Sequence, residues 1–192
     1  MPETETAVAE QKTAENTGSS VGMRIEKRNG SFEPVDLNKI VRAIQLHSHE
    51  LTKVDPMIVA TRTISGIYDG ATTAELDQLA IQTAASYIAT EPEYSQLAAR
   101  MFNTFIGKEV RSRDIQSFSQ SIRYGHEQGL VNDHVFDFVR ANRRKLNDAI
   151  DKNRGKLFQY FGLRTVYDRY LLKDPQSRMV TEIPQYFFMR VA

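Results

Sequence analysis

The sequence predicts a mostly α-helical protein in which a short β-hairpin precedes four helices. Asn29-Gly30 separates two stretches with strand character, residues 25–28 and 32–35. Asn-Gly is a strong hairpin signal, because a type I′ turn needs positive φ at both central residues. After Asp36, apolar residues recur with helical spacing in successive segments. Together these observations favour a hairpin followed by a helical unit of domain size.

The four expected helices have recognisable starts. The first begins at Asp36, a good N-cap residue. The second begins at Asp55-Pro56, since Asp suits the N-cap and Pro the first helical position. Thr72 and Glu75 form a capping-box pattern before the third helix. The fourth, at residues 94–106, has the most apolar stripe in the chain.

The pattern after residue 111 is looser. The expected elements are a helix through Phe118 and Ile122 closed by residues 125–129, a helix capped by Asn132-Asp133, an irregular stretch at 153–162, a short helix at 165–172, an extended piece at 179–181 and a helix from Pro184. Residues 186–192 are mostly apolar and carry no cap or basic tail. We therefore expect the chain to be an N-terminal fragment of a longer protein.

Composition bounds the class of protein. Residues 1–22 contain almost nothing apolar, so a disordered tail is expected there. This tail also lacks the basic and apolar regions of a secretory signal, which predicts a cytoplasmic location. The net charge of +1 gives no whole-chain reason to expect a nucleic-acid or membrane partner.

Cysteine is absent, which excludes disulfides, thiolate metal sites, cysteine nucleophiles and thiol radical chemistry from this chain. No catalytic residue is predicted. His47 and His49 are two residues apart on a helix and point in different directions. His126 and His134 have no evident partners in the sequence, so no metal site is expected.

The stretch 24–44 is a candidate anion site. Lys27 and Arg28 end a strand, and Lys39 lies in the first turn of a helix whose N-terminus favours phosphate. Each cation also has a simpler interpretation. Lys27 and Arg28 could be strand charges that discourage aggregation, and Lys39 could be a solvated helix residue. Lys108 could be a lysine that interacts favourably with a helix C-terminus. Thr73 could likewise only help to cap its helix.

The same stretch resembles a known module, the ATP-cone of ribonucleotide reductases, which binds effector nucleotides. The opening of that module is similar to Ile25-Glu-Lys-Arg-Asn-Gly-Ser-Phe-Glu-Pro-Val-Asp-Leu-Asn-Lys-Ile40. Its later parts resemble residues 68–73, the segment Tyr94-Ser-Gln-Leu-Ala-Ala-Arg100 and Lys108, in that order. The resemblance implies an ATP-cone at residues 23–111.

Residues beyond the cone resemble the N-terminal helical region of the class I large subunit. The matching segments are residues 160–165, 170–172 and 182–192. The resemblance thus covers about residues 23–192 and implies that 112–192 form an incomplete part of that helical region.

Carried over residue by residue, the resemblance implies an effector nucleotide site. Its expected members are Lys27, Arg28, Lys39 and Lys108 facing the phosphates, Glu33, Val35 and Asp36 lining the base and ribose side, Pro34, Leu37 and Asn38 in the same loop, and Thr73 contributing its hydroxyl. Asp36 stands where a relative often has Asn, which removes a donor towards the base. Asp77 falls where some relatives have His and has no assigned role.

The functional hypothesis is that this is the N-terminal part of a ribonucleoside-diphosphate reductase large subunit. The resemblance implies ATP and dATP as allosteric effectors, with Mg²⁺ as companion ion and no covalently bound cofactor. It further implies a small radical-generating subunit and self-association of the large subunit as partners. A chain without cysteine cannot perform thiol-based reduction alone. The alternatives are a stand-alone ATP-cone sensor, such as a transcriptional regulator, or a structural helical module without a ligand.

Two further residue groups have simpler interpretations. The basic stretch 140–156 favours a solvated helix face or subunit contact over a nucleic-acid patch. An aromatic group is expected to be core rather than a base-stacking platform, and it comprises Phe158, Tyr160, Phe161, Tyr167, Tyr170, Tyr186, Phe187 and Phe188.

Overall fold

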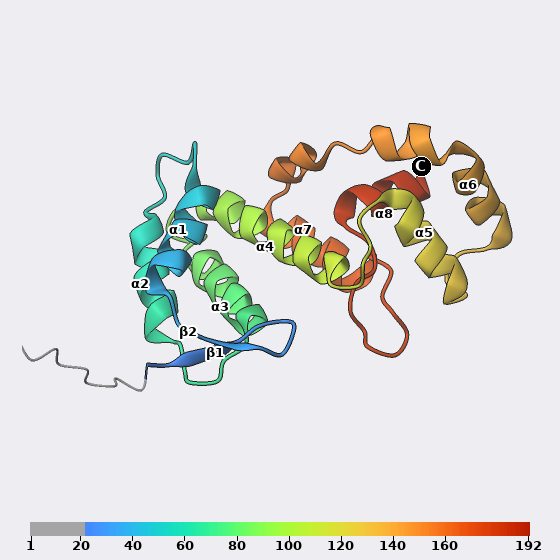
Figure 1. Ribbon diagram of the computed structural model, residues 1–192. Coiled ribbons are helices and arrows are strands. Elements are labelled where there is room, and N and C mark those ends of the chain that lie inside the picture. The colour runs from blue at the N-terminus through green and yellow to red at the C-terminus, as the bar shows by residue number, and fades with distance from the viewer. Residues whose placement is uncertain (1–21) are drawn as a thin grey trace, which may run out of the picture.

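The computed structural model describes residues 22–192, and it confirms a mostly helical chain with a two-stranded hairpin near its start (Figure 1). The tail predicted to be disordered lies outside the described residues, apart from its last position. The hairpin and α1 to α3 form one end of the molecule, and α5 and α6 lie at the other, with α4 running between them. None of the helices among residues 22–192 is long and apolar enough to cross a membrane.

The hairpin pairs β1 (Arg24–Glu26) with β2 (Phe32–Pro34) in antiparallel register, with Ile25 opposite Glu33. Its backbone continues into α1 (Leu37–Ser48), which begins as predicted after Asp36. The Asp36 carboxylate accepts a hydrogen bond from the backbone N–H of Lys39 at 3.2 Å, so it satisfies a donor that the helix itself leaves unpaired.

The three following helices, α2 (Pro56–Ser65), α3 (Thr73–Ser86) and α4 (Tyr94–Arg111), also begin where the sequence predicts. Helices α2 and α3 begin at their caps, and α4 begins at Tyr94, which has no side-chain cap. The capping box is present, because Thr72 accepts from the Glu75 backbone and the Glu75 carboxylate accepts from the Thr72 backbone. The α4 stripe is buried, with Leu97, Ala98 and Ile106 fully enclosed, so α4 forms the centre of the core.

The second half of the described chain is helical too. Its elements are α5 (Phe118–Glu127), α6 (Asp133–Asp148), the 3₁₀ helix η1 (Lys152–Leu157), α7 (Tyr160–Arg169) and α8 (Pro184–Val191). The first helix, α5, ends at Glu127, within the predicted closing stretch 125–129. Two predictions were wrong: 153–162 is largely helical, and α7 starts five residues before residue 165. The cause for α7 is tertiary, since the Tyr160 N–H donates to the Ser95 hydroxyl of α4 at 3.0 Å.

The aromatic group contributes to the core, as expected, but not all of its members are buried. Tyr186 is 3% exposed, and Phe158, Tyr160, Tyr167 and Phe187 pack partly buried against the core. Phe102 of α4 lies 5.0 Å from Tyr167 and 6.1 Å from Tyr160 between ring centroids. Three members remain largely exposed: Phe161, Tyr170 and Phe188.

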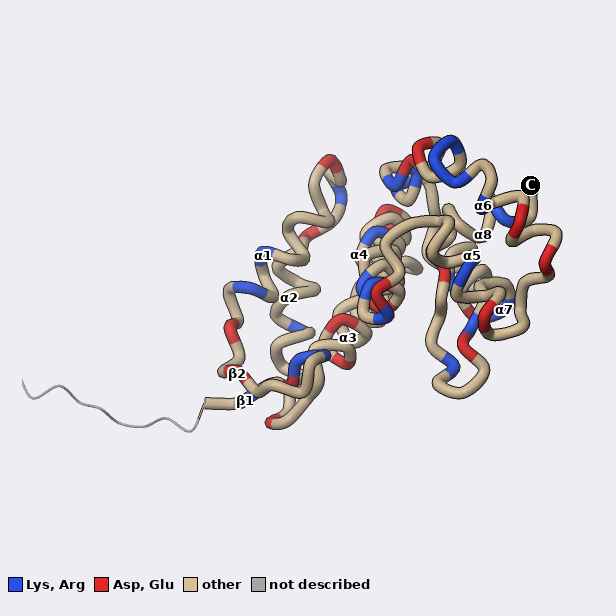
Figure 2. Tube along the Cα trace, turned by 45° about the vertical axis from the view of Figure 1, so that its right-hand side comes forward, with Lys and Arg blue, Asp and Glu red and all other residues tan. Residues whose placement is uncertain are grey.

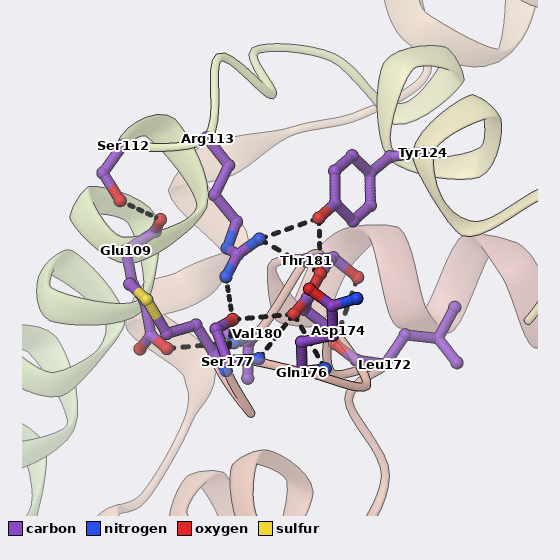
Figure 3. A network of polar contacts seen from close by, with 11 residues as sticks. Glu109, Ser112, Arg113, Tyr124, Leu172, Asp174, Gln176, Ser177, Val180 and Thr181 are labelled. Carbon is purple, nitrogen blue, oxygen red and sulfur yellow. Dashed lines mark hydrogen bonds and ion pairs between the residues drawn. The ribbon is translucent and has the colours of Figure 1, made fainter. Parts of the chain in front are cut away.

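The loop between α7 and α8 is held by polar contacts, shown in Figure 3. Asp174 accepts from the backbone N–H of Ser177 at 2.7 Å and from the Tyr124 hydroxyl at 2.6 Å. These hydrogen bonds, with Arg113 nearby at 3.3 Å, hold the pKa of the Asp174 carboxyl well below its usual range. The loop is thereby joined to α5 and to the end of α4.

Candidate functional site

A cavity of about 380 Å³ opens between the hairpin, α1, α3 and α4. Cationic, acidic and apolar side chains all contribute to its wall. The lining residues are Ile25, Lys27, Arg28, Glu33, Val35, Asp36, Lys39, Ile40, Ala43, Ile44, His47, Thr73, Leu76, Asp77, Ala80, Met101, Thr104 and Lys108. The cavity therefore has a polar rim near the hairpin and an apolar floor formed by helix side chains.

The hairpin turn places Lys27 and Arg28 at this rim. The Gly30 N–H donates to the Lys27 carbonyl at 2.9 Å, and the Lys27 N–H donates to the Ser31 carbonyl at 2.8 Å. Gly30 has a φ of 79°, whereas Asn29 is not among the residues with positive φ. The predicted type I′ turn is therefore wrong: the loop is longer, with glycine at the single left-handed position. Asn29 instead accepts the Ser31 N–H with its side chain at 3.1 Å.

The hairpin is fixed against the loop that precedes α3. The Arg24 N–H donates to the Asp69 carboxylate at 2.8 Å, and the Gly70 N–H donates to the Arg24 carbonyl at 2.8 Å. The Glu26 N–H donates to the Ala71 carbonyl at 3.0 Å. These hydrogen bonds bring the hairpin beside the start of α3, and so place Thr73 at the same cavity as the hairpin cations.

Most of the predicted site residues meet at this cavity. Those that line it are Lys27, Arg28, Glu33, Val35, Asp36, Lys39, Thr73 and Lys108. Pro34, Leu37 and Asn38 do not line it and are exposed on the neighbouring loop and first turn of α1. The structure thus brings together cations from the hairpin, α1 and α4, which are far apart in sequence.

Each of these cations faces a carboxylate. Glu33 lies 2.6 Å from the Lys27 ammonium and 3.4 Å from that of Lys39. The hydrogen bond from Lys27 is the main reason that the pKa of the Glu33 carboxyl is lowered. On the other side, Asp77 accepts from Lys108 at 2.9 Å and from Arg28 at 3.3 Å. The rim is therefore a set of paired, partly exposed charges.

Several wall residues were not predicted, and Asp77 and His47 are the most informative. His47 lies four residues after Ala43 on α1, so helical spacing could have placed it beside the predicted face. Burial, aided by the nearby cations Lys108 and Arg100, lowers the pKa of His47. The imidazole is thus held neutral at the cavity floor.

The basic stretch lies elsewhere. Figure 2 shows its Lys and Arg residues along α6 and the turn that follows, far from the hairpin. Arg140 pairs with Asp137 one turn away at 2.9 Å, and Lys156 lies 3.9 Å from Glu50. These cations do not line the cavity, so its positive charge comes from the hairpin, α1 and α4 alone among the described residues.

Comparison with known proteins finds two family models that match separate segments of the chain. The family model described as the ATP cone domain matches residues 23–116, and that of the ribonucleotide reductase all-alpha domain matches residues 156–192. The chain thus carries an ATP cone domain followed by a segment of the ribonucleotide reductase all-alpha domain. The cavity described above lies entirely within the segment that matches the ATP cone.

Curated proteins similar to this chain include ribonucleoside-diphosphate reductase large subunits from several organisms. The ribonucleoside-diphosphate reductase large subunit of Caenorhabditis elegans is 37% identical over 179 residues, which cover 88% of this chain and 22% of that protein. Those of Arabidopsis thaliana (35%) and Saccharomyces cerevisiae (large chain 2, 36%) cover 88% of this chain and 21% and 20% of their own lengths. The chain thus spans about a fifth of the relatives it matches.

Proposed function

We propose that the cavity binds ATP or dATP as an effector, with Lys27, Arg28, Lys39 and Lys108 holding the triphosphate. The observation that supports this best is the convergence of cations from the hairpin, α1 and α4 on one cavity of about 380 Å³. It lies along the first turns of α1, where the helix dipole favours an anion. Hydrogen bonds from ammonium and guanidinium groups to phosphate are charge-assisted and are therefore stronger than those between neutral groups.

The remaining walls suit the nucleoside. Glu33, Val35 and Asp36 line the junction between the hairpin and α1, and Thr73 adds a hydroxyl from α3. The apolar floor, including Ile40 and other helix side chains, offers a surface for a base. Since ATP and dATP differ by one hydroxyl, discrimination between them would act through the ribose-facing residues of this junction and their effect on α1.

Mg²⁺ is part of this proposal. Oxygen ligands are present at the rim in Glu33 and Asp77, which is the ligand type that Mg²⁺ prefers. Both carboxylates, however, already face cations of the site. The phosphate oxygens and water would therefore supply most of the metal's ligands, and the metal would offset part of the phosphate charge.

For the whole protein, we propose an activity switch on ribonucleoside-diphosphate reduction. ATP would favour an active assembly with a small radical-generating subunit, and dATP would favour an inhibited oligomer of large subunits. Such a switch requires the two nucleotides to bind two quaternary states with different free energies. This chain contains no cysteine, so we expect it to be inactive in reduction on its own. A cytoplasmic location belongs to the same proposal.

The alternative of a stand-alone nucleotide sensor, such as a transcriptional regulator, has less support. The match to the reductase all-alpha domain at residues 156–192 lies beyond the cone and favours the reductase. The third possibility, a helical module without a ligand, is separated from both by a binding measurement.

Isothermal titration of the full chain with ATP and with dATP tests the proposal. We expect saturable heat with both nucleotides. The double charge reversal Lys27→Glu and Lys39→Glu should weaken binding by more than about 100-fold, because two charge-assisted contacts become repulsive. The matched control reverses two exposed cations of α6, Arg143→Glu and Arg144→Glu, and should bind normally. No heat with either nucleotide at millimolar concentration would rule out the site.

A further inference from the structure

A second cavity, of about 510 Å³, opens where the segment that matches the ATP cone meets the helices that follow it. Its walls come from the end of α1, the middle of α4 and the 3₁₀ helix η1. We call it the junction cavity. His47 and Thr104 line both this cavity and the proposed nucleotide site, so the two are neighbours. The η1 wall lies outside both the cone and most of the all-alpha match, so neither family model describes the junction cavity as a whole.

Arg100 of α4 brings to this wall a guanidinium edge that the fold does not use. Its Nη1 donates to the carbonyl of His47 at 3.1 Å and to that of His49, and so satisfies the end of α1. Its Nε is buried and has no acceptor among the described residues, and its Nη2 lies 4.0 Å from the Glu50 carboxylate, too far for a hydrogen bond. Adjacent guanidinium donors form a fork that can bind two oxygens of one phosphate.

The 3₁₀ helix η1 adds two cations on an anchored backbone. The Lys152 carbonyl accepts from the Gln185 amide at 3.2 Å, which ties η1 to α8. Gly155 lies so close to α4 that a Cβ there would clash with the Asn103 amide. The side chains of Lys152 and Lys156 are exposed at the cavity wall. The fold therefore fixes where these two ammonium groups start while leaving them able to meet a ligand.

The charge of the junction cavity favours a dianion. Arg100, Lys152 and Lys156 line it together with a single carboxylate, that of Glu50, which leaves two net positive charges with histidines taken as neutral. We propose that the junction cavity binds a phosphate group, either free phosphate or the phosphate of a small monoester, through these three cations. The cavity is larger than one phosphate ion, so the organic part of a monoester has room. Such a ligand would link α4 of the cone to η1 and fix the junction between them.

The main competing interpretation is that the two lysines are ordinary solvated residues. Glu50, whose side chain is 59% exposed, lies 3.9 Å from Lys156 and 4.0 Å from Arg100. Ion pairs of this length and exposure are weak, so Glu50 does not hold the cations away from a ligand. If the lysines were only solvated, phosphate would act no differently from chloride at the same ionic strength.

The test is isothermal titration of the full 192-residue chain with inorganic phosphate and with glycerol phosphate, at an ionic strength held constant with sodium chloride. We expect saturable binding. The variant with Lys152→Gln and Lys156→Gln should bind at least about tenfold more weakly, because two of three charge-assisted contacts are lost. The matched control, Arg143→Gln with Arg144→Gln, removes the same charge from exposed positions of α6 and should bind like the parent chain.

Phosphate could also enter the proposed nucleotide site, and two further measurements separate the two cavities. The titrations are repeated in the variant with Lys27→Glu and Lys39→Glu, which should keep its affinity for phosphate. In ¹⁵N-labelled chain, the side-chain amide signals of Asn103 and Asn153, which line the junction cavity, should shift on addition of phosphate.

The outcomes decide the inference independently of ATP binding. If the double glutamine variant binds phosphate as tightly as the parent chain, or if only signals of the hairpin move, the junction cavity is not the site and the proposal is wrong. Tighter binding of glycerol phosphate would identify a monoester as the ligand, and equal binding would show that free phosphate is sufficient. Either result supports a phosphate site. Thermal unfolding shows that each variant is folded.

Discussion

Two polar clusters of this chain use ion pairs in opposite ways. At the cavity, the paired side chains are partly exposed, from 27% for Glu33 to 68% for Lys39. Beside α8, Glu182 is completely buried and accepts from Arg190 at 2.9 and 3.0 Å and from the Leu172 N–H at 2.8 Å. Exposed pairs can exchange partners at little cost, whereas a buried carboxylate is strongly destabilising once its partners are lost.

The same contrast extends to the loop between α7 and α8. Glu109, buried in α4, accepts from the Val180 N–H at 2.9 Å and from the Tyr167 hydroxyl at 3.0 Å. Burial, together with this carboxylate, raises the pKa of Tyr167 well above its ordinary value. Every acceptor oxygen of Glu109 is therefore used by the fold. A ligand could compete for the cavity cations, but not for these buried partners.

The largest expected effect comes from breaking the buried cluster. Glu182→Ala leaves the Arg190 guanidinium and the Leu172 N–H without their acceptor, and should lower the free energy of unfolding by about 3 kcal/mol or more. Urea unfolding followed by circular dichroism measures this loss. Glu127→Ala is the matched control, because the ion pair between Glu127 and Arg123 is exposed to water, like the cavity pairs. That control should cost less than about 1 kcal/mol. Equal costs for the two variants would remove the contrast between the clusters.

A smaller effect is expected at the hairpin turn, which presents Lys27 and Arg28 to the cavity. Gly30 has a φ of 79°, and a Cβ built there meets nothing within 4 Å. Gly30→Ala therefore introduces backbone strain without a clash and should cost about 1 kcal/mol. If the turn positions the cations, nucleotide affinity should fall as well. A variant with normal stability and normal affinity would show that the left-handed conformation is not required. The control is Gly162→Ala, where φ is not positive and space is open.

The success of the sequence-based predictions depended on where each signal lies. Asp36, Asp55, Thr72 and Asn132 cap helices through hydrogen bonds to residues two or three positions later, so the information is local and the helix starts could be predicted. Lys27, Arg28 and Lys39 could likewise be proposed from their place at a strand end and a helix start, whereas Lys108 came only from the family resemblance.

Apart from the hairpin turn, where the deciding contacts are local, the errors fall where the deciding contact is distant. The start of α7 depends on the Ser95 hydroxyl, 65 positions earlier. Gly155 in η1 allows close packing, because a Cβ there would lie within 3.0 Å of the Asn103 amide. Likewise, pairing of Asp77 with Arg28 and Lys108 depends on how the hairpin and α4 are placed against α3. None of these contacts has a signature in neighbouring residues.

The smallest expected effect is a difference in how His47 of the cavity and Asp174 of the loop between α7 and α8 respond to acid. The pKa of His47 at the cavity floor is lowered from 6.5, mainly by burial. Its neutral form is favoured by folding, so its contribution to stability is complete above pH 6.5 and is lost as pH falls through the lowered value. The pKa of Asp174 is lowered from 3.8. The contribution of Asp174 is therefore complete above pH 3.8 and is lost only in stronger acid.

The change in urea midpoint between pH 7.5 and pH 5 should therefore depend on His47 of the cavity and not on Asp174. We expect His47→Gln to flatten the fall in stability over this range, because the variant has no imidazole to protonate on unfolding. His49→Gln, two residues away with its side chain 79% exposed, should keep the slope of the parent chain. If His47→Gln leaves the slope unchanged, the imidazole is not held neutral by the cavity. In that case water reaches the cavity floor despite its apolar lining. The contacts at the floor would then be as weak as the exposed ion pairs at the rim.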